Sequence, residues 1–280
     1  MSRKTVWITG AYGSLGTQIC SMIDREKYEV LTSDREVDVT DRNAVIDYAK
    51  EYQPDVLINC AGIREETGSE EESLEMYRVN ALGARNQAMA CVQVGAKMIQ
   101  MSTDDVFAGD VSMELTEFDP TIPTTDYGKS KLAGEKFVES LAPDHLIVRS
   151  SWVYGLTGRN FLTYILKMAE DTQILSVPND QISTPTSAIS LARFIIKMID
   201  SEERGIYHAS CGGSCSRYGF AHAILDYAGI TSMQLVPVLT SSKEMKARYT
   251  VLRNLMMELE GNYQMPDWRT ALKECLAAKQ

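Results

Sequence analysis

Short apolar runs alternate with longer amphipathic segments along the first 150 residues. In the segment after the first run, Leu15, Ile19 and Met22 recur at the spacing that places them on one face of a helix. Strands that alternate with amphipathic helices are typical of βαβ units around a parallel sheet. The pattern predicts an α/β fold with a Rossmann-like, doubly wound parallel sheet. Its strands are expected at residues 6–9, 30–33, 56–60, 98–101 and 146–149.

Local signals set the ends of the expected helices. Thr40 and Asp41 combine a capping residue with a first-turn acid, so a second helix should begin there and end before Pro54. A third, long helix is expected over residues 73–94, where Gly95 can end it in a left-handed conformation.

The regular alternation loosens after residue 149. Gly, Pro and Ser clusters there separate three helical segments, at residues 161–169, 187–198 and 218–228. No low-complexity linker or internal repeat divides the chain, so we expect two parts that share a wide contact and exchange elements. Residues 1–150 would form the Rossmann-like domain and 151–280 a smaller, partly interleaved α+β domain, with a ligand between them.

Composition and charge narrow the class of protein. The 280 residues are 44% hydrophobic and 24% charged, and no apolar run is long enough to cross a bilayer. A formal net charge of −10 argues against nucleic-acid and anionic-membrane partners, which need a clustered positive field. The first residues pass straight into a strand-like run without an apolar signal region, so we expect a cytoplasmic protein.

The six cysteines are scattered, and most fall in apolar periodic segments, as reduced and buried intracellular thiols do. We therefore expect no disulfides. His208, Cys211, Cys215 and His222 are metal-ligand residue types, but they form neither a CxxC nor an HxxxH pair. A strand end, a glycine turn and a helix are expected at these positions, and no metal.

A glycine-rich segment, GAYGSLG at residues 10–16, links the first strand directly to the first helix. Glycines allow the tight turn, the approach of the backbone to a pyrophosphate, and close packing of helix and strand. The spacing GxxGxxG belongs to the short-chain reductase variety of the nucleotide-binding fold. The residues expected to contact the dinucleotide here are Gly10, Tyr12, Gly13, Ser14, Leu15 and Gly16.

The end of the second strand carries the expected contact to the adenosine ribose. Asp34 would accept a hydrogen bond from a 2′-hydroxyl and would repel a 2′-phosphate, by about 1–4 kcal/mol depending on the local dielectric. Arg35 acts in the opposite direction, because its guanidinium can pair with that phosphate. The expected cofactor is therefore NADPH or NADH, with the choice left open.

Tyr127 and Lys131 are four residues apart at the start of a segment with helical periodicity, so they share one face. They follow a strand that ends in Thr103, at the ligand edge of the sheet. Reduction of a ketone needs a proton donor beside the carbonyl, and Tyr127 would supply it. Lys131 would lower the pKa of the phenol and hold the nicotinamide ribose, and the Thr103 hydroxyl would orient the substrate oxygen. These three residues are the predicted catalytic set.

Together these motifs resemble the dTDP-4-dehydrorhamnose reductases, an extended short-chain dehydrogenase/reductase family. The likeness spans nearly the whole chain and includes the segments 10–16, 38–41, 54–59, 79–81, 102–107, 127–131, 149–155, 160–161, 180–186, 205–208 and 265–272. It implies NAD(P)H-dependent reduction of a 4-keto-6-deoxy sugar nucleotide, dTDP-4-dehydrorhamnose to dTDP-L-rhamnose. It implies further cofactor contacts at Asp38, Val39, Cys60, Ala61, Gly62 and Asn80. It implies substrate contacts at Thr103, Asp104, Asp105, Val106, Phe107, Trp152, Asn160, Gln181 and Arg248.

The chain departs from the family pattern at two places that face the ligand. Asp105 stands where the family usually has an aromatic residue, and Cys60-Ala61-Gly62 replaces Ala-Ala-Tyr. The segment 103–105 also resembles the Thr-Asp-Glu of sugar-nucleotide dehydratases. A dehydratase or epimerase, and an NAD(P)-binding regulatory subunit of another enzyme, are therefore kept as alternatives. The sequence leaves the oligomeric state open, a homodimer being one option.

Overall fold

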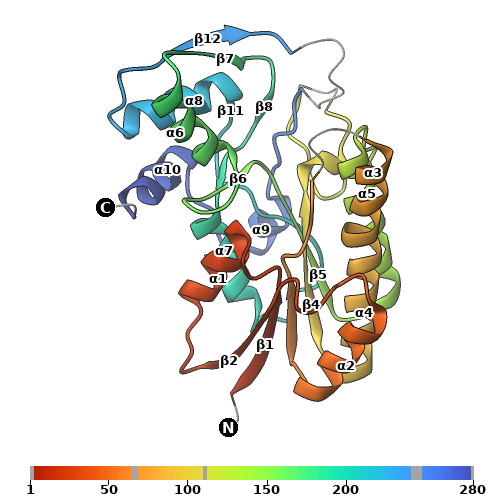
Figure 1. The fold of residues 1–280 in the computed structure, drawn as a ribbon. Coiled ribbons are helices and arrows are strands. Elements are labelled where there is room, and N and C mark those ends of the chain that lie inside the picture. The colour runs from red at the N-terminus through yellow and green to blue at the C-terminus, as the bar shows by residue number, and fades with distance from the viewer. Residues whose placement is uncertain (1–2, 65–68, 110–111, 241–247, 279–280) are drawn as a thin grey trace.

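The computed structural model describes residues 3–64, 69–109, 112–240 and 248–278. Six parallel strands form the main sheet, in the order β10-β5-β4-β3-β1-β2 (Figure 1). They are β1 (Lys4–Thr9), β2 (Tyr28–Ser33), β3 (Val56–Asn59), β4 (Lys97–Thr103), β5 (His145–Ser150) and β10 (Gly205–His208). The predicted α/β class with a parallel, doubly wound sheet is confirmed.

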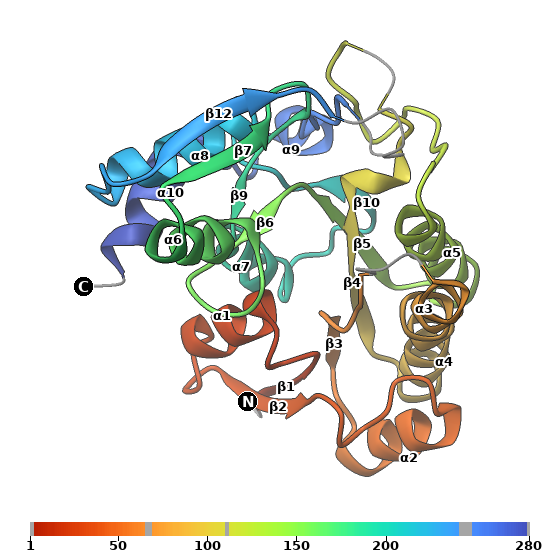
Figure 2. The same cartoon turned by 45° about the horizontal axis from the view of Figure 1, so that its top comes forward.

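Helices cover both faces of this sheet (Figures 1 and 2). One layer contains α1 (Ser14–Met22) and α7 (Ala188–Met198), and the other contains α2 (Arg42–Tyr52), α4 (Ala84–Val94) and α5 (Asp126–Leu141). Successive residues of a strand point to opposite faces, so Val6 and Ile8 pack in the cluster with α1 while Trp7 packs in the cluster with α2. This two-sided burial explains why the strands read as continuous apolar runs.

The helix expected over residues 73–94 has a break in its geometry. It consists of α3 (Glu70–Met76), a π-helical segment η1 (Tyr77–Gly83), and α4. At the end of this segment Gly83 lies so close to Val39 that an added Cβ would be 2.9 Å from the Val39 Cγ2. A π turn cannot be read from a 3.6-residue apolar period, and such turns are frequent at functional sites.

The second half of the chain contributes to the main sheet and also forms three two-stranded sheets of its own, β6-β9, β7-β12 and β8-β11. Its strand β10 pairs with β5, and its helix α7 packs on α1. The remaining elements are β6 (Val153–Tyr154), α6 (Phe161–Asp171), β7 (Ile174–Pro178), β8 (Ile182–Ser183), β9 (Thr186–Ser187), β11 (Cys215–Ser216), α8 (Arg217–Tyr227), β12 (Gln234–Val238), α9 (Leu255–Glu260) and α10 (Trp268–Ala277).

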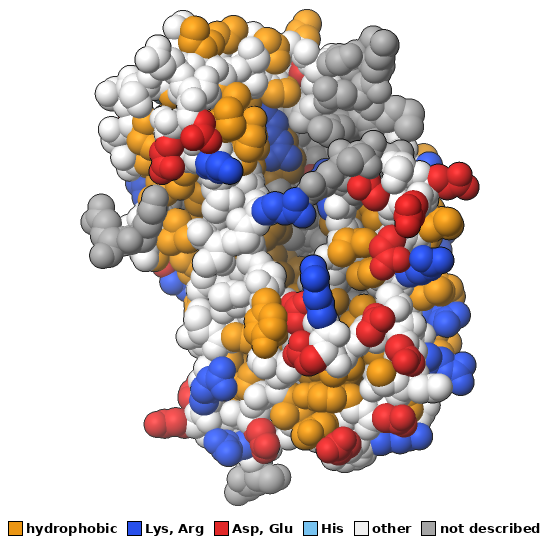
Figure 3. All heavy atoms as spheres, viewed as in Figure 1, with side chains coloured by type: hydrophobic (Ala, Val, Ile, Leu, Met, Phe, Trp, Pro, Cys, Tyr) orange, Lys and Arg blue, Asp and Glu red, His pale blue; other side chains and the backbone are white. Residues whose placement is uncertain are grey.

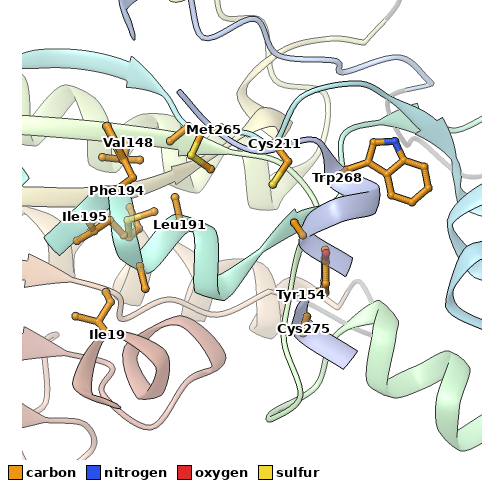
Figure 4. Close-up of a cluster of buried hydrophobic side chains, with 14 of the residues drawn as sticks. Ile19, Val148, Tyr154, Leu191, Phe194, Ile195, Cys211, Met265, Trp268 and Cys275 are labelled. Atoms are coloured by element: carbon orange, nitrogen blue, oxygen red, sulfur yellow. The ribbon is translucent and has the colours of Figure 1, made fainter. Parts of the chain in front are cut away.

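One hydrophobic core joins the two halves. Ile19 of α1 and Val148 of β5 belong to the same buried cluster as Trp268 of α10 (Figure 4). The cluster also encloses the Tyr154 hydroxyl, which is buried without a hydrogen-bond partner among the described residues. Among the residues that the structure describes, no helix is both long enough and apolar enough to cross a bilayer.

The strand order fixes where a ligand can bind. The chain leaves β1 toward β2 on one side and returns to β3 on the other, so the connections after β1 and β3 diverge. Such a switch point opens a crevice at the carboxyl ends of the strands. The glycine turn after β1 and Thr103 at the end of β4 both lie at this edge.

Candidate active site

A cavity of about 640 Å³ opens at the carboxyl ends of β4 and β5. Figure 3 shows a hollow in this face of the molecule, with basic side chains along it. Both halves of the chain contribute to its walls. The residues predicted from the sequence that line it are Thr103, Asp104, Asp105, Tyr127, Trp152, Asn160 and Gln181.

The carboxyl end of β4 meets the first turn of α5 at the floor of this cavity. Thr125 caps α5 by accepting from the Gly128 amide, and Tyr127 lies in the first turn. An added Cβ at Gly128 would be 2.0 Å from the Asp105 carbonyl oxygen, so the glycine allows the helix to approach the end of β4. The Thr103 hydroxyl accepts from the Asp105 amide at 3.1 Å and interacts with the Tyr127 phenol.

The phenol of Tyr127 is a weaker acid than the sequence predicts. Burial raises its pKa to about 12, and the Arg64 guanidinium, which lies over the ring at 5.0 Å from its centroid, has the largest opposing effect. The lowered pKa that was expected from Lys131 is not found, because desolvation of the phenolate outweighs the cation that acts on it, and that cation is Arg64. Tyr127 is therefore protonated at neutral pH, as a proton donor must be.

Lys131 lies one helical turn further along α5, buried against β4. Its ammonium donates to the Met101 carbonyl oxygen at 2.7 Å. Burial lowers the pKa of Lys131 to about 8, and the Glu135 carboxylate one turn further acts in the opposite direction. An added Cβ at Gly62 would be 3.8 Å from the Lys131 Nζ, so the ammonium also faces the loop after β3.

A buried ionic cluster around Glu135 lies one helical turn beyond Lys131. Glu135 accepts from Arg149 of β5 at 2.9 and 2.7 Å, and it also accepts from the Ser102 hydroxyl. Met101 and Ser102 are adjacent on β4, so consecutive residues of this strand bind Lys131 and Glu135. The cluster fixes α5 relative to β4 and β5.

Asp104 connects the end of β4 to the second half of the chain. Its Oδ2 accepts from the Thr250 hydroxyl at 2.5 Å and from the Ser183 hydroxyl at 3.1 Å, and its Oδ1 accepts from Thr103 at 3.3 Å. Burial, followed by the neighbouring Asp105 carboxylate, raises the pKa of Asp104 to about 6. Asp105 pairs with Arg64 at 3.2 Å.

The glycine turn after β1 is tightly packed. Gly10 has a φ of +63°, and an added Cβ at Gly16 would be 2.3 Å from the Gly10 carbonyl oxygen. Gly13 is the N-cap of α1, and among the described residues no side chain caps the amides of the first turn. From the second half, the Thr157 carbonyl oxygen accepts from the Ser14 hydroxyl at 2.6 Å, beside Leu15.

The residues after β2 lie beside this turn. The Asp34 carboxylate accepts from the Tyr12 amide at 3.2 Å, and its side chain is half-buried, whereas Arg35 and the Tyr12 ring are exposed. Asp34 is thus held next to the glycine turn, and Arg35 stands free of it at the surface. Asp38 further along this connection is exposed, and Val39 is buried against η1.

The loop after β3 is held by Asn80 of η1. The Asn80 amide nitrogen donates to the Ile63 carbonyl oxygen and to the Ser130 hydroxyl, and its oxygen accepts from the Ile63 amide. This pairing draws the segment 60–62, with Cys60, Ala61 and Gly62, toward α5. An added Cβ at Gly10 would be 2.5 Å from the Ala61 backbone nitrogen, so this segment also packs on the glycine turn.

Three residues expected to bind substrate are not among the described residues that line this cavity. Val106 and Phe107 are buried in a hydrophobic cluster with Leu115, and the Arg149 guanidinium covers the Phe107 ring at 5.3 Å. Arg248 is exposed, beside residues outside the described ranges, and its backbone amide donates to the Gly109 carbonyl oxygen at 3.1 Å. The chain makes a single 3₁₀ turn after β4 (Asp104–Val106), and this turn leads Val106 and Phe107 into the hydrophobic cluster, away from the cavity.

Residues that no sequence motif indicates also line the cavity. Arg64, Arg217 and Thr250 come from three distant segments and face Asp104 and Asp105. Their positions depend on long-range contacts, and none lies in a spacing motif that would have indicated it.

The residues weighed as metal ligands form ordinary structure. His208 ends β10, a glycine turn follows Cys211, and His222 lies on α8. Burial lowers the pKa of His208 to about 3, and one ring nitrogen lies 3.1 Å from the Arg253 carbonyl oxygen. Within the described ranges, no three His, Cys, Asp or Glu side chains gather as metal ligands would.

Comparison with known proteins gives the family. The family described as "RmlD substrate binding domain" matches residues 4–280. The spore coat polysaccharide biosynthesis protein SpsK of Bacillus subtilis is 37% identical, covering 97% of this chain and 96% of that protein. A dTDP-4-dehydrorhamnose reductase of Mycobacterium tuberculosis is 34% identical, covering 97% and 92%.

A solved structure agrees over the same length. The dTDP-4-dehydrorhamnose reductase of Bacillus anthracis, in complex with NADP, is 36% identical and has a TM-score of 0.95, covering 99% of this chain and 100% of that chain. Sequence and fold thus match the same relatives along almost the whole chain. The chain therefore belongs to the RmlD substrate binding domain family, with the dTDP-4-dehydrorhamnose reductases that its motifs resemble.

Proposed function

We propose that this protein reduces the 4-keto group of dTDP-4-dehydrorhamnose to give dTDP-L-rhamnose, with NADPH or NADH as hydride donor. The observation that carries the proposal is the convergence of Thr103 and Tyr127 on one cavity, with Lys131 buried beneath it. Relatives that are named as reductases of this substrate and match nearly the full length support it.

The glycine turn fits a dinucleotide. The amides of Ser14 and Leu15 in the first turn of α1, which no described side chain caps, would bind the pyrophosphate, and Asp34 would accept from the adenosine ribose. Lys131 would donate to the nicotinamide ribose from its place beside Gly62. When bound, the cofactor supplies the hydride.

The residues of the chain would carry the proton and orient the substrate. Tyr127 would donate its proton to the carbonyl oxygen as the alkoxide forms, because the phenol is protonated at neutral pH. The Thr103 hydroxyl, which otherwise donates to Asp104 Oδ1, would turn its proton to the same oxygen and hold the carbonyl in line. Residues 1–150 would bind the cofactor, and Trp152, Asn160 and Gln181 of residues 151–280 would contact the sugar nucleotide.

We also infer that the reaction takes place in the cytoplasm. All six cysteines are free thiols, as is usual in a reducing compartment.

The test is NADPH oxidation by the purified protein with dTDP-4-dehydrorhamnose. We expect turnover, and we expect Tyr127→Phe to lower kcat by about 100- to 10,000-fold while NADPH binding is kept. Tyr52→Phe is the control, because Tyr52 is exposed on α2, outside the residues that line the cavity, and should change kcat little. Absence of NADPH consumption with any 4-keto-6-deoxy sugar nucleotide would overturn the proposal. NAD that copurifies and is not consumed would favour the dehydratase or epimerase.

A further inference from the structure

Arg217 is the first residue of α8 and lines the cavity beside Trp152. Its guanidinium carbon lies 3.5 Å from the centre of the Trp152 ring and 4.9 Å from that of Phe161. Stacking on an aromatic face fixes the plane of a guanidinium and leaves its N–H groups free at the edge. Trp152 itself has a φ of +40°, an uncommon backbone conformation for a large residue.

The described residues give this guanidinium no hydrogen bond, although its backbone amide donates to Gln181 at 3.0 Å. The nearby carboxylates are engaged elsewhere. Asp105 pairs with Arg64, and Asp104 accepts from hydroxyl groups. Burial lowers the pKa of Arg217 to about 10, so the group is still a cation at neutral pH. This guanidinium lies in a cavity with its plane fixed and its N–H groups without acceptors among the described residues. It is therefore suited to bind an anionic ligand group.

We propose that Arg217 binds the diphosphate of the sugar nucleotide. This inference rests on the proposed function and names the residue that recognises the anionic part of that substrate. A guanidinium donates two parallel hydrogen bonds to phosphate oxygens, and the N-terminus of α8 adds positive potential at the same place. Arg217 shares the cavity with Thr103 and Tyr127, so one substrate can reach the arginine and the catalytic residues together.

The chain offers a matched control in Arg269. It also lies over a tryptophan near a helix N-terminus, with its guanidinium carbon 4.4 Å from the centre of the Trp268 ring, on α10. It does not line the cavity. Arg217→Gln therefore removes a stacked cation inside the cavity, and Arg269→Gln removes a similar one outside it.

The experiment measures binding of dTDP, dTMP and thymidine by calorimetry in the presence of NADPH. We expect Arg217→Gln to weaken dTDP binding by about 10- to 100-fold, and thymidine binding by less than about twofold. Arg217→Lys should recover part of the dTDP affinity, because it keeps the charge without the fork. Arg269→Gln should change none of the three affinities.

Two results would overturn the inference. One is dTDP affinity in Arg217→Gln within about twofold of the wild type. The other is a parallel loss of dTDP and thymidine affinity, which would indicate a misshapen cavity. Wild-type turnover of dTDP-4-dehydrorhamnose, measured alongside, separates a failure of this inference from a failure of the proposed function. NADPH binding by each variant checks that the chain is folded.

Discussion

The Arg64 guanidinium lies over the ring of Tyr127, 5.0 Å from its centroid, while Lys131 donates to the backbone of β4. The cation that acts most on the phenol therefore comes from the loop after β3. Arg64 also pairs with Asp105 at 3.2 Å, which holds a negative charge near the same ring. The acidity of Tyr127 depends on this pair.

Replacement of Arg64 should make Tyr127 a weaker acid. Arg64→Met removes the cation that opposes burial and leaves Asp105 unpaired, and both changes raise the pKa of Tyr127 above about 12. Because the efficiency of a general acid falls as its pKa rises away from the operating pH, we expect kcat at pH 7 to fall by about tenfold. Arg64→Lys should keep most of the rate. Equal kcat for the wild type and Arg64→Met would remove Arg64 from the mechanism.

The buried pair of Glu135 and Arg149 should be needed for stability. Glu135→Gln leaves the Arg149 cation buried without a carboxylate, which costs about 3–5 kcal/mol when one partner of such a pair is removed. Ser102→Ala removes one hydrogen bond to Glu135 and keeps the pair, so its loss should be smaller. Urea unfolding measures both, and a larger loss for Ser102→Ala would contradict this account.

Asp104 should make stability depend on pH below neutrality. Its pKa in the folded chain is raised to about 6 from the ordinary 3.8, so the folded state binds the proton more tightly than the unfolded state. Ionisation then costs stability, and the loss develops as pH rises from about 4 to about 6. The charged groups that face Asp104 are Asp105, Arg64 and Arg217, and Tyr127 adjoins it.

Asp104→Asn removes this titration. The difference in free energy of unfolding, Asp104→Asn minus wild type, should increase between pH 4 and pH 6 and then stay constant. Thermal unfolding across that range checks it, with Asp47→Asn on the exposed face of α2 as a control for loss of a surface charge. A constant difference between Asp104→Asn and the wild type would show that Asp104 is not shifted.

The glycine turn should not tolerate a methyl group at residue 16. An added Cβ there would be 2.3 Å from the Gly10 carbonyl oxygen, a backbone atom that cannot move alone. We expect Gly16→Ala to cost about 1–3 kcal/mol of unfolding free energy, and to weaken NADPH binding because the turn shifts. Gly212→Ala is the matched control, since its Cβ would meet nothing closer than 3.8 Å. Similar losses for both would contradict the packing argument.

The sequence by itself determined the α/β class, five of the six strands of the main sheet (β1 to β5) and the glycine turn, because these depend on local periodicity and on residues adjacent in the chain. It also indicated Thr103 and Tyr127, since the carboxyl ends of parallel strands meet at one edge of a sheet. Only the tertiary structure decided that Arg64, Arg217 and Thr250 surround Asp104. These contacts join segments far apart in the chain, which no local pattern records.

The direction in which the Tyr127 pKa shifts was also decided by the tertiary structure. Spacing placed Lys131 on the same helix face, but the balance between burial and charge depends on how deeply the phenol lies and on where each cation points. Val106 and Phe107 likewise follow the active-site strand in sequence and turn into the core. Proximity along the chain selects candidates, and three-dimensional packing determines which of them reach the ligand.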